Sequence, residues 1–357
     1  MALAAPTPLP QRRLRRAVRT AVRNLDPGAF AFVMATGIVS SALDRDGTRG
    51  ASAALLVIGL SGYGVLLLGN GWRLLCWRRR LLADAVGPSG FAFLTAVAAS
   101  NILADRMAAD GHRTAAAVLL AVGVLGWLLL GYGIPLALVA AARRRPSLDQ
   151  VNGTWFLWVV ATQSVAVAAV ALDRLTPAAH GFLPEFASVC WAIGLMQYVL
   201  VAPLVLSRML VRPMAPEELI PAYWVFMGAG AISVLAGTAL LRLPAADRLL
   251  PAEVTSALCF VLWSFATWLV PLLIALGAWR YLARHVPLRF ASSLWSLVFP
   301  VGMYGVATRQ LGSAVGVSWL TTLGEGEAWL AAAVWAVVFL AMLAALTRSL
   351  CRTETSQ

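Results

Sequence analysis

The residues best suited to a chemical role lie in one apolar stretch, SSLWSLVFPVGMYGVATRQLG, which spans residues 292–312. It is apolar enough to lie in a membrane, yet it carries Pro300 in its interior, with Gly302 and Gly305 close behind. Because a proline donates no backbone hydrogen bond, we expect Pro300 to kink this helix near mid-membrane. The kink and the glycines would push the Phe299 ring across a narrow axis and form a hydrophobic gate. The alternative is that Phe299 only packs beside the kink.

Charge along such a pathway decides which ions pass. Arg309 lies near the far end of the same stretch and would attract anions, or else its side chain snorkels to the lipid headgroups. A proton- or cation-coupled pump usually places carboxylates or histidines inside the membrane. Here almost no acidic residue falls at mid-depth, and those nearest to the apolar segments lie near their ends, at Asp26, Asp84, Asp173, Glu185 and Glu253. We therefore expect any axial pathway to favour small anions.

The residues of common enzymes and metal sites are missing. The sequence has no G-x-S-x-G, H-E-x-x-H or Walker motif. Its four cysteines are widely spaced and its three histidines fall in expected loops, so we predict no metal site and no cofactor. The polar residues at mid-membrane offer hydroxyls and one amide but no base: Thr36, Ser100, Thr162, Gln163 and Ser233. We predict no enzymatic activity, and a membrane enzyme or a non-transporting scaffold remains the alternative of another class.

Composition identifies an integral membrane protein. Hydrophobic residues make up 60% of the 357 residues, charged residues only 12%, and the mean hydropathy is +0.79. All 28 basic residues are arginines, which produce a net charge of +12. These arginines stand at the ends of apolar runs and are not interleaved with aromatic residues. They therefore indicate membrane topology, and we expect no nucleic acid partner.

Ten apolar segments of about the length that spans a bilayer follow one another, which predicts an all-α polytopic membrane protein. They are 27–43, 52–76, 87–104, 114–142, 153–172, 183–211, 219–241, 252–282, 292–312 and 327–350. The intervening loops are short, so consecutive helices should be antiparallel neighbours. About 20 of the 28 arginines then fall on one side, which predicts that both termini are cytoplasmic.

We divide the chain into three parts. Residues 1–25 form a basic cytoplasmic segment, 26–350 the ten-helix transmembrane domain, and 351–357 a short cytoplasmic tail. The first segment has apolar residues at helical spacing among six arginines. This pattern fits a short helix on an anionic membrane surface, or a segment that only retains the N-terminus inside.

The odd-numbered segments resemble one another. Each begins with Pro, Gly, Asn or Ser, continues with an aromatic cluster, and ends in small residues, whereas the even-numbered segments are bulkier. This repeat predicts five parallel helical hairpins around a central pore, with the small-residue helices inside and the bulky helices facing lipid. The candidate pore-lining residues are Phe32, Thr36, Phe93, Thr162, Gly230 and Tyr304.

Three motifs carry a resemblance to a known family. DPGAFAFVMATGIVSSAL, AYWVFMGAGAISVLAGTAL and FPVGMYGVAT resemble the tellurite-resistance/dicarboxylate transporter family. That family includes bacterial TehA, fungal malate permeases and sulfite efflux pumps, and the plant guard-cell slow anion channels. The resemblance covers about residues 25–350 and implies ten helices in five hairpins, a pore through each protomer, and a homotrimer. It also implies a pore-blocking phenylalanine in the ninth helix, which falls on Phe299.

The last motif is most similar to the bacterial branch labelled as dicarboxylate or malate transport. We therefore expect an anion channel or transporter of the bacterial inner membrane, for four-carbon dicarboxylates such as malate or for small inorganic anions. The alternative transport function is efflux of sulfite or another oxyanion, of the tellurite-resistance type.

Overall fold

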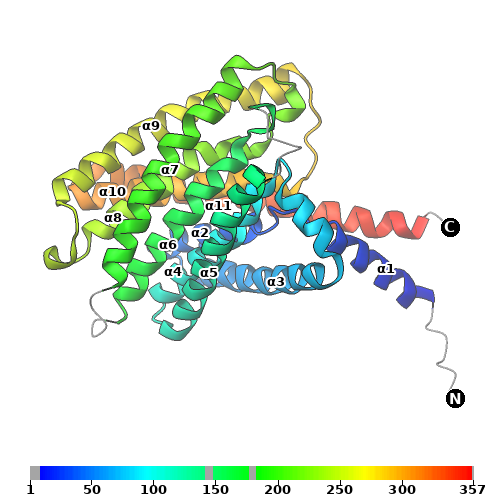
Figure 1. Cartoon of the computed structure of the whole chain (residues 1–357), viewed down its shortest axis with the longest axis horizontal. Coiled ribbons are helices and arrows are strands. Elements are labelled where there is room, and N and C mark those ends of the chain that lie inside the picture. The colour runs from blue at the N-terminus through cyan, green and yellow to red at the C-terminus, as the bar shows by residue number, and fades with distance from the viewer. Residues whose placement is uncertain (1–8, 141–147, 177–181, 356–357) are drawn as a thin grey trace.

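The structure is a computed structural model that describes residues 9–140, 148–176 and 182–355 (Figure 1). Parts of the predicted terminal segments, and of two loops, lie outside these residues. The described residues form eleven α-helices and no strand. After the short α1 (Leu9–Arg23), the ten predicted apolar segments correspond in order to α2–α11, so the predicted fold class is confirmed. The last helix, α11 (Ser318–Thr355), continues past 350, where the sequence suggested that a tail begins.

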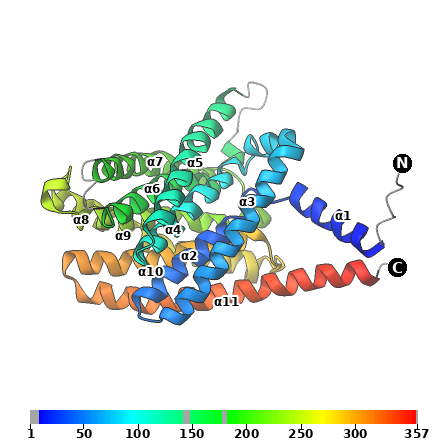
Figure 2. The ribbon, with the colours of Figure 1, turned by 90° about the horizontal axis from the view of Figure 1, so that it is seen from below.

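Five helices form an inner ring: α2 (Ala31–Arg45), α4 (Thr95–Ala109), α6 (Leu157–Asp173), α8 (Val225–Leu241) and α10 (Trp295–Val315). Each inner helix contacts the next one, and α10 contacts α2, so the ring closes. Five longer helices surround the ring: α3 (Arg49–Ala85), α5 (Arg113–Ala140), α7 (Leu183–Val211), α9 (Ala252–Ala278) and α11. Each packs against the inner helix before it as a hairpin, and α10 and α11 lie side by side in Figure 2.

Burial separates the two layers as the composition predicts. In the most apolar window of α4, α6 and α8, 78–89% of the residues are buried, against 17–39% in the five outer helices. Small residues let the inner helices approach one another closely, while the bulky outer helices leave their apolar side chains exposed for lipid. Within the residues that the structure describes, eight helices are long and apolar enough to span a membrane, and α2 and α10 are not among them. The 15 residues of α2 are fewer than the roughly 20 that a span requires.

The inner helices begin with the starter residues and aromatic clusters seen in the sequence. Short 3₁₀ turns precede α4, α6, α8 and α10, at Gly90–Leu94, Gly153–Phe156, Pro221–Trp224 and Ser292–Leu294. Asn152 caps one of these turns by accepting a hydrogen bond of 2.9 Å from the Thr154 backbone N–H. The rings of neighbouring repeats then pack together, as Phe91 does on Trp155 with their centroids 4.9 Å apart.

One aromatic side chain of every outer helix makes a hydrogen bond to the next inner helix along the chain. The last outer helix, α11, makes the corresponding hydrogen bond to the first inner helix, α2. We call these five bonds the aromatic ties. They join Tyr63 to Ser100 (2.6 Å), Trp127 to Thr162 (2.9 Å), Trp191 to the Ser233 carbonyl (2.9 Å), Trp263 to Thr308 (3.0 Å) and Trp335 to Thr36 (2.9 Å). The ties repeat the same contact around the ring, so the predicted internal repeat extends to tertiary contacts.

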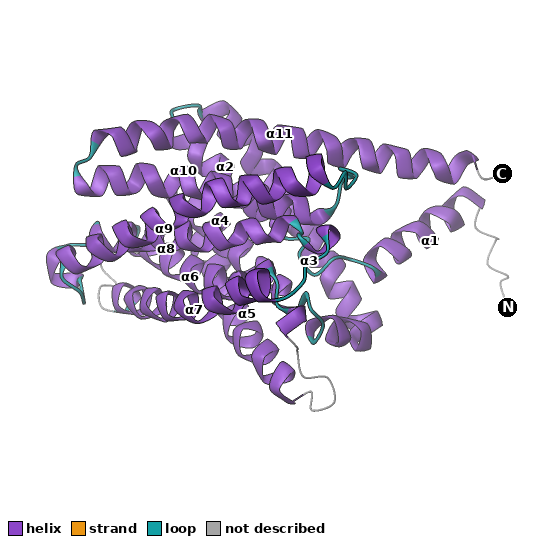
Figure 3. Ribbon diagram, turned by 90° about the horizontal axis from the view of Figure 1, so that it is seen from above, coloured by secondary structure: helices purple, strands orange, loops and turns teal. Residues whose placement is uncertain are grey.

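The two ends of the described chain lie at one end of the molecule. In Figure 3, α1 and the last part of α11 project from the same end of the bundle. The predicted basic N-terminal helix is present as α1, and its Arg19 lies over the Trp77 ring at 5.7 Å from the centroid. The backbone of α3 departs from helical geometry at Trp77, so α1 packs where α3 bends.

Candidate functional site

A small cavity lies on the axis of the inner ring. Each inner helix contributes at least one lining residue, including Ile38 of α2, Asp105 of α4, Ser164 of α6, Ile232 of α8 and Met303 of α10. The cavity has a volume of about 10 Å³, and a site of this size holds about one water molecule. The axis is therefore too narrow at this level for a hydrated anion to pass.

Phe299 lies one helical turn from this cavity. It precedes Met303 by four residues on α10, and residues so spaced share one face of a helix. Since Met303 lines the cavity, the spacing predicts that the Phe299 ring also faces the axis. Its side chain is fully buried, with 0% exposed.

Pro300 packs closely against α8 at Gly228. A Cβ atom added to Gly228 of α8 would lie 2.9 Å from the Pro300 Cγ, so the glycine makes room for the proline ring. Gly305 makes room for α11 in the same way, because a Cβ atom added to it would lie 2.9 Å from the Glu327 Cβ. The helix α10 is assigned as a single element through Pro300, and a kink there stays a prediction.

An arginine stands near the end of every inner helix, at Arg45, Arg106, Arg174, Arg242 and Arg309. A cation in or just after the last turn, as at Arg45, Arg106, Arg174 and Arg242, interacts favourably with the negative end of the helix dipole, whereas Arg309 lies further from the end of α10. Two of the five are neutralised locally. Arg106 pairs with Asp44 at 3.1 Å and Asp110 at 2.5 Å, and Arg309 pairs with Asp46 and, at 3.4 Å, with Glu325.

The other three arginines act electrostatically on one carboxylate, as Arg106 also does. Arg45, Arg174 and Arg242 come from the ends of α2, α6 and α8, and all three interact electrostatically with Asp105 of α4. Partial burial, with the positive charges of Arg45 and Arg174, lowers the pKa of Arg242 to about 10, while Asp105 raises it. We call these four residues the carboxyl-end cluster, because they lie where the inner helices end.

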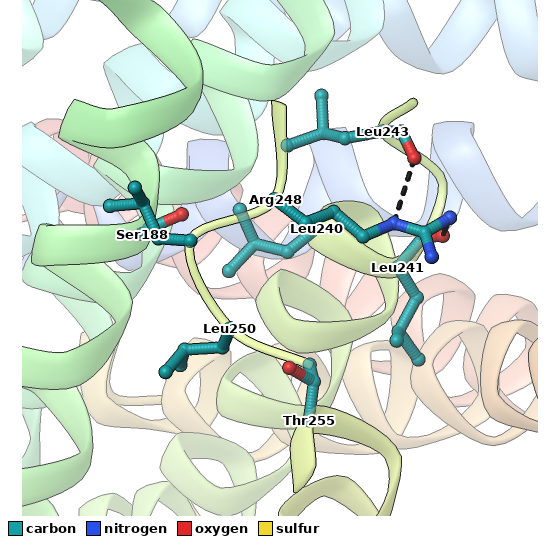
Figure 4. A pocket seen from close by; sticks show the side chains of 8 residues that line it. Ser188, Leu240, Leu241, Leu243, Arg248, Leu250 and Thr255 are labelled. Atoms are coloured by element: carbon teal, nitrogen blue, oxygen red, sulfur yellow. Dashed lines mark hydrogen bonds between the residues drawn. The ribbon is translucent and has the colours of Figure 1, made fainter. Parts of the chain in front are cut away.

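Arg248 is an arginine close in sequence to this cluster that has a different role. Figure 4 shows it in the connection between α8 and α9, above a small pocket that includes Ser188 and Thr255. Its guanidinium donates hydrogen bonds to the carbonyls of Leu241 (2.6 Å) and Leu243 (2.8 Å). Arg248 thus satisfies carbonyls at the end of α8.

Residues 24–343 match the family model described as "Voltage-dependent anion channel". The chain belongs to the voltage-dependent anion channel family. An uncharacterized membrane protein of Mycobacterium tuberculosis is 44% identical over 163 residues, which are 44% of this chain and 81% of that protein. An uncharacterized transporter of Methanocaldococcus jannaschii is 23% identical over 330 residues, which are 89% of this chain and 92% of that protein.

Membership in the anion channel family confirms the family predicted from the three motifs, and it assigns the protein to anion transport rather than to enzymes. The match specifies no substrate. The functional site of this family member is therefore to be sought along the axis that its inner helices enclose.

The structure turns most of the predicted pore-lining residues toward the outer helices. The Thr36 and Thr162 hydroxyls accept aromatic ties from α11 and α5. Phe32 packs on Phe339 of α11, and Gly230 faces Tyr198 of α7 and Ala266 of α9. The Tyr304 hydroxyl lies 2.7 Å from the Thr267 hydroxyl of α9. Phe93 is partly buried against the core. None of these six lines the axial cavity, and their contacts favour packing; pore lining elsewhere along the axis stays a prediction.

Asp105 is a lining residue that was not among the predicted site residues. It stands one residue beyond the apolar run that ends at 104, where the sequence suggested the start of a loop. The structure places it in the lining of the axial cavity, so the expectation that the axis lacks carboxylates is wrong at this position. A sequence signal did exist, because Asp44-Arg45, Asp105-Arg106 and Asp173-Arg174 repeat one dipeptide at the ends of three inner helices.

Proposed function

We propose that the protein conducts anions along the axis of its inner ring and that Phe299 is the gate. The observation that carries this proposal is the axial cavity, which all five inner helices line and which lies one turn from a fully buried phenylalanine. A phenyl ring on an apolar axis excludes water, and an ion that meets it loses hydration without compensation. Movement of the ring away from the axis would open the path.

The charges near the axis support selection of anions. Arg45, Arg174 and Arg242 form no ion pair within 4.0 Å among the described residues, and their positive charges act on the single carboxylate of Asp105. Such a charge raises the local concentration of anions and repels cations. We propose four-carbon dicarboxylates such as malate, or small inorganic anions, as the cargo, on the basis of the motif around Phe299.

We further propose that the protein is a homotrimer in a bacterial inner membrane, with both termini in the cytoplasm. The arginine distribution supports this topology, as does the common position of α1 and the end of α11. Large apolar side chains on the outer helices, such as Leu129 (73% exposed) and Val139 (81% exposed), are available to lipid or to neighbouring protomers. The trimer itself follows from the family resemblance.

Flux measurements in liposomes test the cargo. We expect the Phe299→Ala protein to dissipate gradients of malate, chloride, nitrate or sulfite, with reversal potentials that follow the anion gradient and not the potassium gradient. Efflux of sulfite without malate flux would favour the oxyanion alternative. Failure to move any of the four anions would leave the scaffold alternative.

A further inference from the structure

A second pocket lies away from the axis, at the end of α9. Its lining includes Tyr223 from the turn that precedes α8, Gly277 from the last turn of α9, and Leu297 from the first turn of α10. It also includes Arg280, which lies in a π-helical turn, Trp279–Ala283, that continues α9. Such turns are rare and often mark functional sites. The pocket thus brings a charged side chain to the place where three elements meet.

Arg280 has donors left for a ligand. Its guanidinium donates a hydrogen bond to the Leu219 carbonyl and lies over the Tyr281 ring at 5.2 Å from the centroid. Its Nε atom is buried without a hydrogen-bond partner, and in the described part of the chain Arg280 forms no ion pair within 4.0 Å. Glu218, which precedes Leu219, is already paired with Arg208 at 2.9 Å. A positive charge therefore remains unneutralised beside the pocket.

The surroundings of the pocket match the headgroup level of a membrane. The pocket lies at the end of the membrane-spanning α9, and residues 279–290 contain three arginines, one histidine and no acid. The Arg284 guanidinium lies over the Trp279 ring at 5.4 Å from the centroid. Aromatic rings are enriched where helices leave the membrane. Apolar side chains close by are exposed, as at Ile274 (56%) and Leu282 (73%). The pocket therefore lies where a lipid presents its phosphate.

We propose that this pocket binds an anionic phospholipid, with the lipid phosphate on Arg280 and the acyl chains along the exposed apolar face of α9. Guanidinium groups suit phosphate because their planar N–H donors match its oxygens, and basic pockets between membrane helices bind lipid headgroups. The pocket has a volume of about 30 Å³, so most of the ligand lies on the outer surface. A free phosphate ion would leave the apolar lining uncovered at Leu219, Leu273 and Leu276.

The bound lipid braces the helices that line the pocket. It contacts the turn before α8, the end of α9 and the start of α10, and these elements come together only in the folded protein. A ligand that binds the folded state alone stabilises it. The pocket takes no part in the axial pathway, so lipid binding can be measured whether or not the protein conducts anions.

Native mass spectrometry of the delipidated protein, titrated in detergent with phosphatidylglycerol, tests the site. We expect Arg280→Gln to bind this lipid at least about tenfold more weakly than the wild type, a change that corresponds to about 1.4 kcal/mol. It should also lose the rise in melting temperature that the lipid gives the wild type. The matched control is Arg289→Gln, at an exposed arginine of the same segment that does not line the pocket. It should retain the wild-type affinity.

A second variant fills the pocket and keeps the test valid if Arg280→Gln does not fold. No atom lies within 4 Å of a Cβ added to Gly277, so the leucine side chain of Gly277→Leu has room to enter the pocket. This variant should fold and bind phosphatidylglycerol at least about fivefold more weakly than the wild type.

Two further ligands identify what the pocket recognises. Phosphatidylcholine, whose choline cancels the charge of its phosphate, should bind the wild type more weakly than phosphatidylglycerol. Glycerol phosphate, which has no acyl chain, should not displace the lipid. Wild-type affinity in both pocket variants, or an equal loss in Arg289→Gln, would overturn the proposal. Equal affinity for the two lipids, or displacement by glycerol phosphate at the concentration of the lipid, would also overturn it.

Discussion

Substitution of Gly228 by alanine tests whether the contact between α8 and α10 positions the gate. The added Cβ would lie 2.9, 3.0 and 3.2 Å from the Pro300 Cγ, Cβ and Cα atoms. Real Cβ atoms almost never approach other atoms so closely, and the proline ring and backbone cannot rotate away as a flexible side chain would. Relief of the contact must therefore shift α10 beside Phe299.

The magnitude follows from two opposing terms. Overpacking of this kind typically costs about 1–3 kcal/mol, while alanine gains about 0.5–1 kcal/mol over glycine inside a helix. We therefore expect Gly228→Ala to lower the free energy of unfolding by up to about 2.5 kcal/mol. The matched control is Gly64→Ala on α3, where no atom lies within 4 Å of the added Cβ, so the protein should be equally or slightly more stable.

Two assays on the same preparations decide the outcome. Thermal unfolding in detergent should show a lower melting temperature for Gly228→Ala than for Gly64→Ala. Anion flux in liposomes should rise in Gly228→Ala, because the displaced backbone carries Phe299 off the axis. A Gly228→Ala protein that matches Gly64→Ala in both assays would refute this account of how α8 holds α10.

Two further predictions concern the aromatic ties and the arginines. Trp127→Phe removes the tie to Thr162 and should lower the free energy of unfolding by about 0.5–2 kcal/mol. The control is Trp329→Phe, because the Trp329 side chain is 56% exposed. Equal melting temperatures of the two variants would contradict a stabilising tie. Arg174→Gln should reduce anion conductance at low salt, and the reduction should shrink as the Debye length falls from about 10 Å at 0.1 M to about 3 Å at 1 M. Arg309→Ala should have a smaller effect, because Asp46 and Glu325 already neutralise Arg309, and equal effects of the two variants would count against the cluster.

The order of the helices and their two layers were predictable from the sequence. Residue size carried this information, because runs of Gly, Ala, Ser and Thr alternate with runs of Leu, Val and Trp along the chain. The small-residue helices had to lie inside, where backbones approach closely. The rotation of each helix about its axis was not predictable, because a helix that is apolar all round has no polar face to orient it.

This lack of orientation explains why the contacts of the candidate pore-lining side chains were not predictable. Thr36 and Thr162 looked like polar pore residues, but their hydroxyls accept hydrogen bonds from Trp335 and Trp127, which are distant in sequence. In a membrane, a buried indole N–H needs such a partner, so the hydroxyls turn toward the outer helices. For Phe299, the family resemblance supplied an expected orientation toward the axis that composition could not, and this orientation stays a prediction.

The most direct test of the central claim is anion flux through the Phe299→Ala protein, compared with the wild type and with Phe156→Ala. Phe156 is also 0% exposed, but it stacks on Phe226 with their centroids 4.5 Å apart. Both substitutions remove a buried ring and should lower stability, by up to about 3–5 kcal/mol, so melting temperature alone does not separate a gate from a packed ring. We predict that Phe299→Ala raises anion flux well above the wild type without raising potassium flux, and that Phe156→Ala does not. Wild-type flux in a folded Phe299→Ala protein, or an equal rise in both variants, would contradict the gate.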